Sequence, residues 1–242
     1  MQFILDIHCH TIASGHALNT LEENLTCAKE IGLMLTGTSE HGPNMPGSCP
    51  LSHFLDIAKL PDFLNGMHWL KGAEANIINT SGKLDMPDDI LAKLDFCIAS
   101  VHSSIFYPGD KGANTEAIIG TMENPYVDII GHLGDANVPI NPHPIVIAAK
   151  KTGTLIEINN KSLIPGNRRY DGGNTIRKIL ALCKAHGTPV IAGSDAHIAK
   201  DVGQLEQARS FIIDSGIDES LVINTNLLRF KEVLKGKRRY GK

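Results

Sequence analysis

Short apolar runs alternate with amphipathic stretches along the whole chain. Seven of these runs are four to ten residues long and rich in Ile, Val, Leu or aromatic side chains. Parallel strands that are buried on both faces have continuous apolar runs, so this pattern predicts a parallel sheet. The predicted strands are Phe3–Ile7, Leu35–Thr38, Trp69–Ile78, Phe96–Val101, Val127–Gly131, Leu155–Ile158 and Val190–Gly193.

Helix patterns lie between the predicted strands, and several have recognisable starts. Thr20–Glu23 forms a capping box that opens a helix through Ile31. Asn141–Pro142 places a cap before a first-turn proline, and Asn174 precedes the helix pattern of Ile176–His186. Because strands and helices alternate without a linker or an internal repeat, we expect one α/β barrel of parallel strands.

The end of the chain has a different composition. A last helix is predicted over roughly Asn226–Leu234, and it runs into the basic segment Lys235–Lys242. We interpret this basic segment as a solvated tail, with a phosphate-binding role as the alternative.

Composition narrows the class of protein. The chain has 242 residues, of which 42% are hydrophobic and 20% charged, and this excludes a disordered or collagenous chain. A single domain over residues 1–242 fits the length, since one α/β barrel takes about 200 to 250 residues. The formal net charge of −3 gives no general reason to expect nucleic-acid binding, so we expect a partner of metabolite size.

The sequence also bears on the compartment and on the kind of metal site. No apolar run reaches the length of about 18 residues that a membrane span needs, and no basic leader precedes an apolar stretch at the start. We therefore expect a cytoplasmic protein with no membrane partner.

The five cysteines are odd in number and include no Cys-x-x-Cys pair, which argues against disulfides and a thiolate zinc site. Any metal would be bound by nitrogen and oxygen.

Residues that can bind metal stand at the ends of six of the seven predicted strands. In parallel α/β barrels the loops at the carboxyl ends of the strands converge, and binding sites assemble there. The set contains seven histidines and two carboxylates: His8, His10, His16, His41, Glu74, His102, His132, Asp195 and His197.

The spacing within this set supports metal binding. Side chains two residues apart on a strand point to the same face, so His8 and His10 can bind one ion. Asp195 and His197 repeat this spacing. Imidazole suits zinc, manganese and iron, and a carboxylate such as Glu74 can bridge two ions.

Other polar residues are assigned to supporting roles. A single His-x-His pair carries little weight in a chain with eleven histidines, so the prediction depends on the whole set. Asp6 and Glu40 are better suited to accept the second ring N–H of a ligand histidine than to bind metal. The remaining histidines lie in helix patterns or before a strand, and we expect them to be structural: His53, His68, His143 and His186.

The set as a whole resembles the PHP (polymerase and histidinol phosphatase) family, over essentially the whole chain. The segments Leu94–His102, Val127–His132 and Glu157–Asn160 look most like the stand-alone YcdX-type phosphatases within that family. The resemblance implies a distorted (β/α)7 barrel that holds up to three metal ions.

The resemblance also divides the residues among three divalent ions, for which zinc is the first choice and manganese or iron are alternatives. Glu74 would bridge two of the ions. The first site comprises His8, His10, Glu74 and Asp195, the second Glu74, His102 and His132, and the third His16, His41 and His197.

Charge narrows the reaction class. Three divalent ions and two carboxylates leave an excess of positive charge, which favours an anionic substrate. We therefore predict a phosphatase that hydrolyses phosphomonoesters by attack of a metal-bridging hydroxide on phosphorus. The candidate catalytic residues are Glu74, Asp195 and His197. The expected partner is a small phosphorylated substrate, and the oligomeric state, a homo-oligomer included, is left open.

Candidate substrate-binding residues follow the sixth predicted strand. Asn159 and Asn160 stand at the end of this strand. The long polar loop behind them carries Arg168 and Arg169, whose guanidinium groups suit bidentate contact with phosphate. The alternative interpretation is an ordinary surface loop.

Three other functions stay open at this point. The nearest is a phosphodiesterase or 3′ exonuclease that acts on oligonucleotides, which the acidic overall charge disfavours. An amidohydrolase also uses His-x-His on a barrel strand, but that fold usually has eight strands and a strand-borne lysine. The third is a noncatalytic metal-binding module.

Overall fold

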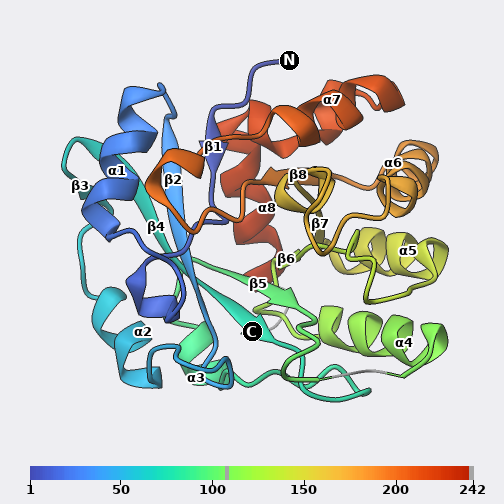
Figure 1. Ribbon diagram of the computed structural model, residues 1–242, viewed down its shortest axis with the longest axis horizontal. Helices are drawn as coiled ribbons and strands as arrows, with labels where there is room; N and C mark the ends of the chain where they lie inside the picture. The colour runs from blue at the N-terminus through green and yellow to red at the C-terminus, as the bar shows by residue number, and fades with distance from the viewer. Residues whose placement is uncertain (107–108, 240–242) are drawn as a thin grey trace.

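Parallel strands form the inner wall of a nearly closed barrel in the computed structural model, which describes residues 1–106 and 109–239 (Figure 1). The strands are β1 (Leu5–Asp6), β2 (Leu35–His41), β3 (Phe63–Leu64), β4 (Met67–Asn76), β5 (Phe96–Ser100), β6 (Ile129–Ile130), β7 (Leu155–Asn159) and β8 (Val190–Gly193). Seven of them pair in parallel in the order β1-β2-β4-β5-β6-β7-β8, and β3 pairs antiparallel with β4. The predicted parallel α/β barrel is therefore confirmed.

The seven predicted strands are all present, but two are shorter than predicted. β1 and β6 have two residues each. After β6 the backbone turns at His132, whose φ of 30° does not continue a strand. The sequence analysis does not predict β3, which Asn65 and Gly66 join to β4 by a tight turn with φ of 51° and 79°.

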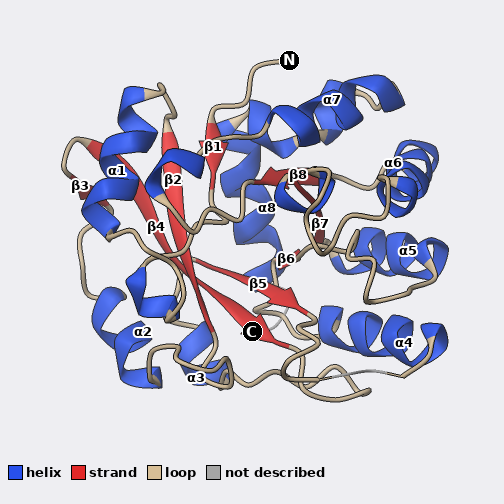
Figure 2. Cartoon of the chain, viewed as in Figure 1, coloured by secondary structure: helices blue, strands red, loops and turns tan. Residues whose placement is uncertain are grey.

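Helices cover the outside of the barrel (Figure 2). The capping box at Thr20 and the proline start after Asn141 are both observed. No helix among the described residues is long and apolar enough to span a bilayer. The α-helices are α1 (Leu21–Glu30), α2 (Leu51–Ile57), α3 (Asp88–Leu91), α4 (Lys111–Met122), α5 (Pro142–Thr152), α6 (Asn174–His186), α7 (Glu206–Ser215) and α8 (Leu227–Arg239). The short 3₁₀ segments are η1 (Ile12–Ser14), η2 (Lys161–Leu163), η3 (Ala199–Asp201), η4 (Glu219–Leu221) and η5 (Ile223–Thr225).

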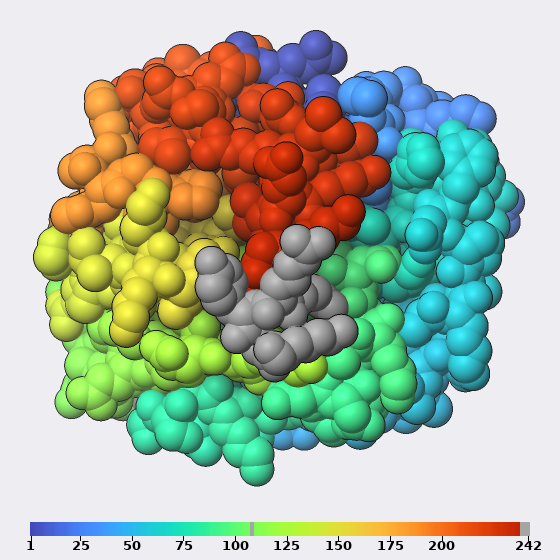
Figure 3. Space-filling model, turned by 180° about the vertical axis from the view of Figure 1, so that it is seen from behind, coloured from blue at the N-terminus to red at the C-terminus, as the bar shows by residue number. Residues whose placement is uncertain are grey.

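Helix α8 covers the end of the barrel at which the strands begin, on the face seen in Figure 3. Phe230 and Leu234 pack there with the first residues of the strands, such as Leu35 and Leu155. The helix extends into the segment predicted as a solvated tail, and Lys237 is buried and donates to the carbonyl of Met122. The prediction of a solvated tail is therefore wrong for Lys237, whereas Lys235 is exposed as predicted; residues 240–242 lie outside the described residues.

A phenylalanine fills the interior of the barrel beneath the polar end. Phe96 in β5 is fully buried, and its ring lies against Gly37 in β2 and Gly72 in β4. A β-carbon at Gly72 would overlap the ring, so the ring requires a residue without a side chain on that strand. This apolar layer separates the polar end of the barrel from α8.

Asn224 in η5 closes the barrel between β1 and β8, which have no ladder of their own. Its side-chain amide donates to the carbonyls of Leu5, at 3.0 Å, and Ala192, at 2.9 Å. Its Oδ1 accepts the backbone N–H of Ala192 at 2.6 Å. Asn224 therefore joins the two strands themselves, and backbone hydrogen bonds of Ala196 with His8 and His10 join the loops that follow them.

Candidate metal centre

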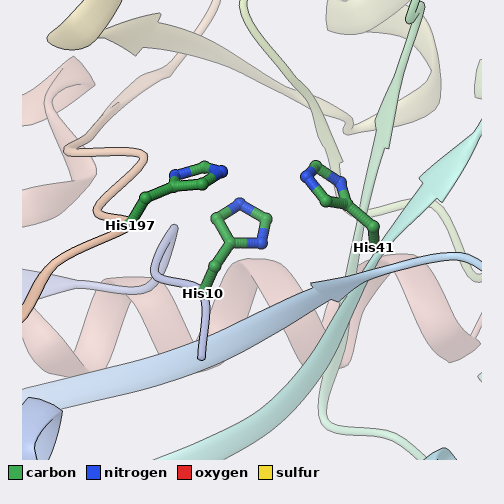
Figure 4. A group of neighbouring side chains, drawn as sticks. All are labelled: His10, His41 and His197. Carbon is green, nitrogen blue, oxygen red and sulfur yellow. The ribbon is translucent and has the colours of Figure 1, made fainter. Parts of the chain in front are cut away.

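The nine predicted ligand residues come together at the carboxyl ends of the strands. His41 ends β2, Glu74 lies in β4, and four of the others follow later strands, whereas three histidines follow β1: His8, His10 and His16. Figure 4 shows His10, His41 and His197 with their rings turned toward one another. Three overlapping groups have donor atoms close enough to hold an ion: His10, His41 and His197; His8, His10 and Glu74; and His41, Glu74 and His102.

Glu74 lies at the centre of the cluster and is fully buried. Its Oε1 lies 3.1 Å from Nε2 of His132 and 3.5 Å from Nε2 of His102. His8 Nε2 is also 3.5 Å from Oε1, and His10 Nε2 is 3.5 Å from Oε2. The two oxygens of one carboxylate thus face separate sets of imidazoles, which is the arrangement that a bridging ligand requires.

Asp195 faces the same cluster from the loop after β8. Its Oδ1 lies 3.5 Å from His10 Nε2 and 3.8 Å from His8 Nε2. Its Oδ2 accepts from Nη1 of Arg169. The φ of Asp195 is 57°, a left-handed conformation that is uncommon outside glycine. One oxygen is thereby held by a guanidinium while the other is directed at the two histidines.

Hydrogen bonds fix the tautomers of several histidines. His8 Nδ1 lies 2.5 Å from Glu157 Oε1, and His102 Nδ1 lies 2.8 Å from the amide oxygen of Asn76. Both partners accept, so Nδ1 carries the proton in the neutral ring and Nε2 keeps its lone pair. His197 Nδ1 lies between an acceptor and a donor, 2.9 Å from the carbonyl of Asp195 and 3.1 Å from Nζ of Lys161.

Glu40 reaches His10 through a serine. Ser14 Oγ donates to Glu40 Oε2 at 2.6 Å, so it accepts from Nδ1 of His10, 3.0 Å away. The sequence analysis predicts that Glu40 accepts a ring N–H directly, but the hydroxyl of Ser14 accepts it instead, and Glu40 supports His10 only through this hydroxyl. The prediction for Asp6 is wrong, because its carboxylate accepts the backbone N–H groups of Ser194 and Gly203 and so organises the loop after β8.

The donor set fits divalent cations. Two ligands of a tetrahedral zinc ion lie about 3.3 Å apart, given zinc–nitrogen distances of about 2.0–2.1 Å. The Nε2 atoms of His102 and His132 are 3.2 Å apart, and those of His16 and His197 are 2.9 Å apart. Within the described chain, five buried atoms of the cluster have no hydrogen-bond partner: His8 Nε2, His10 Nε2, His41 Nδ1, Glu74 Oε2 and Asp195 Oδ1.

The pKa values of several of these residues leave them deprotonated near pH 7, which favours cation binding. Burial lowers the pKa of His102 and of His197 to about 4, so both rings are neutral at pH 7. Burial opposes the charge on Glu74, but the imidazoles of His102 and His8 outweigh it and hold the pKa of Glu74 well below its usual range. Metal ligands must be deprotonated, and these already are.

His8 behaves differently in the absence of a cation. Burial opposes its positive charge, but the carboxylates of Glu157, Glu74 and Asp195 together hold its pKa well above the ordinary value. A cation that binds at His8 therefore displaces a proton. Metal affinity at this position is expected to rise with pH.

The predicted substrate-binding residues fall in different places. Arg169 is buried against Asp195, whereas Arg168 is exposed and its carbonyl accepts from Asn137. The amide of Asn159 lies 3.4 Å from Asp195 Oδ2. Asn160 is directed to α7, where its Oδ1 accepts the N–H of Ala208. The structure thus brings Arg169 and Asn159 to the cluster.

The sequence analysis misses three residues that bear on the site. Glu157 accepts from His8, and Asp85 accepts from the amide of Asn76, which in turn accepts from His102. Lys161 Nζ lies 3.1 Å from Nδ1 of His197. Glu157 and Lys161 stand in or just after the sixth predicted strand, so their position at a strand end was the available signal.

The comparisons with known proteins agree with this geometry. A probable phosphatase of Clostridium botulinum (strain Langeland) is 44% identical over 98% of this chain and 96% of its own length. A probable phosphatase of Thermoanaerobacter sp. (strain X514) is 44% identical over 99% of this chain and 97% of its own. The family model described as PHP-associated matches residues 174–206.

A solved structure shares the fold. The histidinol phosphate phosphatase of Lactococcus lactis, crystallised with zinc, L-histidinol and phosphate, superimposes with a TM-score of 0.65 and 22% identity. The match covers 88% of this chain and 94% of the other. With full-length relatives at 44% identity and this barrel, the chain belongs to the PHP family of phosphatases.

Proposed function

We propose that this protein is a metal-dependent phosphomonoesterase that uses three divalent ions, with zinc as first choice. The observation that carries the proposal is the pair of Nε2 atoms of His102 and His132, 3.2 Å apart and both directed at Glu74. The His102 nitrogen has a lone pair, because its other ring nitrogen faces the acceptor oxygen of Asn76. A cation between the two nitrogens and the Glu74 carboxylate would have all three as ligands.

The proposed sites follow the geometry of the cluster. Glu74 would be shared by two ions, since its two oxygens face different histidines. The group of His10, His41 and His197 supports a further ion, together with His16, whose Nε2 lies 2.9 Å from that of His197. The ions, when bound, would lower the pKa of a coordinated water to about 7 and stabilise negative charge on phosphate oxygens.

Charged side chains at the rim would bind and orient the substrate. Arg169 is fixed by Asp195 and lies 3.7 Å from Asp135, and its guanidinium has five N–H donors for a planar contact with phosphate oxygens. Lys161 adds a second positive charge beside His197. These two cations favour a dianionic phosphate, and the L. lactis histidinol phosphate phosphatase, crystallised with L-histidinol and phosphate, supports a small phosphorylated substrate.

One experiment tests the proposal against its rivals. The purified protein is analysed for bound metal and assayed with p-nitrophenyl phosphate, its bis-ester and short oligonucleotides. We expect divalent metal in the protein and hydrolysis of the monoester that stops after chelation and returns with zinc or manganese. Preferred hydrolysis of the bis-ester or the oligonucleotides would replace the proposal with a phosphodiesterase, and bound metal without turnover would replace it with a noncatalytic module.

A further inference from the structure

We propose that Glu157 is a positioning residue that couples two of the metal sites by holding one ligand histidine of each. Its side chain is buried, and it lies in β7, which pairs with β6, the strand before His132, and with β8. Oε1 lies 2.5 Å from Nδ1 of His8, and Oε2 accepts the backbone N–H of His132 at 2.7 Å. This inference rests on the proposed function, because it concerns the ions of that site.

Glu157 acts differently on the two histidines. At His8 it keeps the proton of the neutral ring on Nδ1, so that Nε2 is the nitrogen free to bind a cation, and this nitrogen faces Glu74 and Asp195. At His132 it holds the backbone, whose φ of 30° is unfavourable for a residue with a side chain. This backbone conformation places Nε2 of His132 beside Oε1 of Glu74. The same carboxylate therefore sets the orientation of two imidazoles that face the same oxygen of the shared ligand, Oε1 of Glu74.

The neighbouring strand is shaped to admit this carboxylate. A β-carbon on Gly193 in β8 would overlap Oε1 of Glu157 and would lie 2.9 Å from the β-carbon of His8. On the other side, a β-carbon on Gly131 would lie 3.5 Å from Oε2. The absence of a side chain at Gly193 leaves Glu157 room to reach His8, which is a reason for glycine at a position where φ does not require it.

An amide cannot replace the carboxylate at this position. His8, His132 and the amide of Asn159 all donate to Glu157, and a carboxylate has two acceptor oxygens, whereas glutamine has one acceptor and one donor group. If the NH₂ group of a glutamine in its place faced His8, the ring proton would move to Nε2 and block the metal-binding lone pair. If it faced His132, two N–H groups would oppose each other and strain the loop. Either orientation weakens at least one site.

The test compares zinc affinities by chelator competition in the unsubstituted protein, Glu157→Gln, Glu40→Gln and the exposed-site control Glu116→Gln. We expect Glu157→Gln to lower the affinity for two ions by about 10- to 100-fold, the usual cost of removing an outer partner of a metal site. Glu40 contacts one ligand histidine, His10, through Ser14, so Glu40→Gln should lower the affinity for fewer ions than Glu157→Gln does. Glu116→Gln should bind zinc as the unsubstituted protein does.

Thermal unfolding of the chelator-treated proteins separates positioning from folding. A second variant, Gly193→Ala, keeps the charge of Glu157 but displaces Oε1 from His8, and it should weaken zinc binding without removing a carboxylate. Unchanged affinity for every ion in either folded variant would overturn the inference while leaving the proposed function intact. If the unsubstituted protein binds no zinc or manganese at all, the proposed function fails, and the inference fails with it.

Discussion

Nε2 of His132 lies 3.1 Å from Oε1 of Glu74, although the two residues are 58 positions apart and β5 separates their strands. The side chain of Glu74 thus extends across the end of the barrel and contacts residues beyond the two strands that pair with β4. A carboxylate in this position joins the imidazoles that follow β1 to those that follow β5 and β6. Its removal should therefore affect more than one ion.

Glu74→Gln should lose metal and activity together. The amide keeps the size of the side chain but loses the negative charge that two cations would share. We expect kcat/KM for p-nitrophenyl phosphate to fall by more than about 100-fold, the upper end of the cost of an outer partner. Elemental analysis should show fewer ions per chain. Glu30→Gln, on the exposed face of α1, serves as the control, and full turnover in Glu74→Gln would show that Glu74 is no ligand.

Arg169 and Arg168 should behave differently although they are neighbours. Arg169 is buried beside Asp195, and Arg168 is exposed. A hydrogen bond to a charged group contributes about 1.5–3 kcal/mol, so Arg169→Lys should raise KM for a phosphomonoester by about tenfold or more. Arg168→Lys should leave KM within about twofold, as for most surface substitutions. Steady-state kinetics at saturating zinc measure both. Equal KM values for the two variants would exclude a phosphate contact by Arg169.

Much of the cluster could be predicted because its members follow strands. His8 and His10 stand two residues apart after an apolar run, and in a parallel barrel such positions converge whatever the remaining sequence. The capping box at Thr20 is equally local, and it appears as predicted. These features depend on spacing along the chain, which the sequence shows directly.

The supporting residues could not be predicted in the same way. Glu157 stands within an apolar strand, and its role depends on the two neighbouring strands that leave room for it. Asp85 acts on His102 through Asn76, a chain of contacts that only the fold creates. Asn224 lies in a segment with no strand pattern, yet it closes the barrel. Such roles arise from tertiary contacts rather than from local pattern.

The metal-free protein should lose stability in acid through His102. Burial lowers the pKa of this imidazole to about 4, against an ordinary 6.5, although Glu74 opposes the shift. Between these values the unfolded chain binds the proton and the folded one does not, so the free energy of unfolding falls as pH falls from 6.5 to 4. The maximum contribution is about 3 kcal/mol, from about 1.4 kcal/mol for each tenfold difference in proton affinity.

His102→Gln isolates this contribution, because glutamine does not titrate. Urea unfolding of the chelator-treated proteins between about pH 4 and pH 7 gives the difference in unfolding free energy between the unsubstituted protein and the variant. As pH falls, we expect the free energy of unfolding of the unsubstituted protein to decrease relative to that of the variant. His8 acts in the opposite direction, since its pKa is raised, but it is present in both proteins. A difference that does not change with pH would contradict the prediction.

Asn224→Ala should destabilise the barrel where β1 meets β8. The substitution removes the partner of the Ala192 N–H and of the carbonyls of Leu5 and Ala192, all at a fully buried position. Each buried polar group left without a partner costs about 1–3 kcal/mol, so we expect a loss of at least about 3 kcal/mol in the free energy of unfolding. The nearby Asn226→Ala is the matched control: Asn226 is exposed, and its side chain accepts one N–H at the start of α8, from Arg229. Its loss should cost about 1 kcal/mol, as for other helix caps.

Urea unfolding measures both variants. Equal losses in the free energy of unfolding would mean that the hydrogen bonds of Asn224 between β1 and β8 add no more stability than a helix cap. Because β1 and β8 carry His8 and Asp195 to the site, Asn224→Ala should also lower zinc affinity, whereas Asn226→Ala should not.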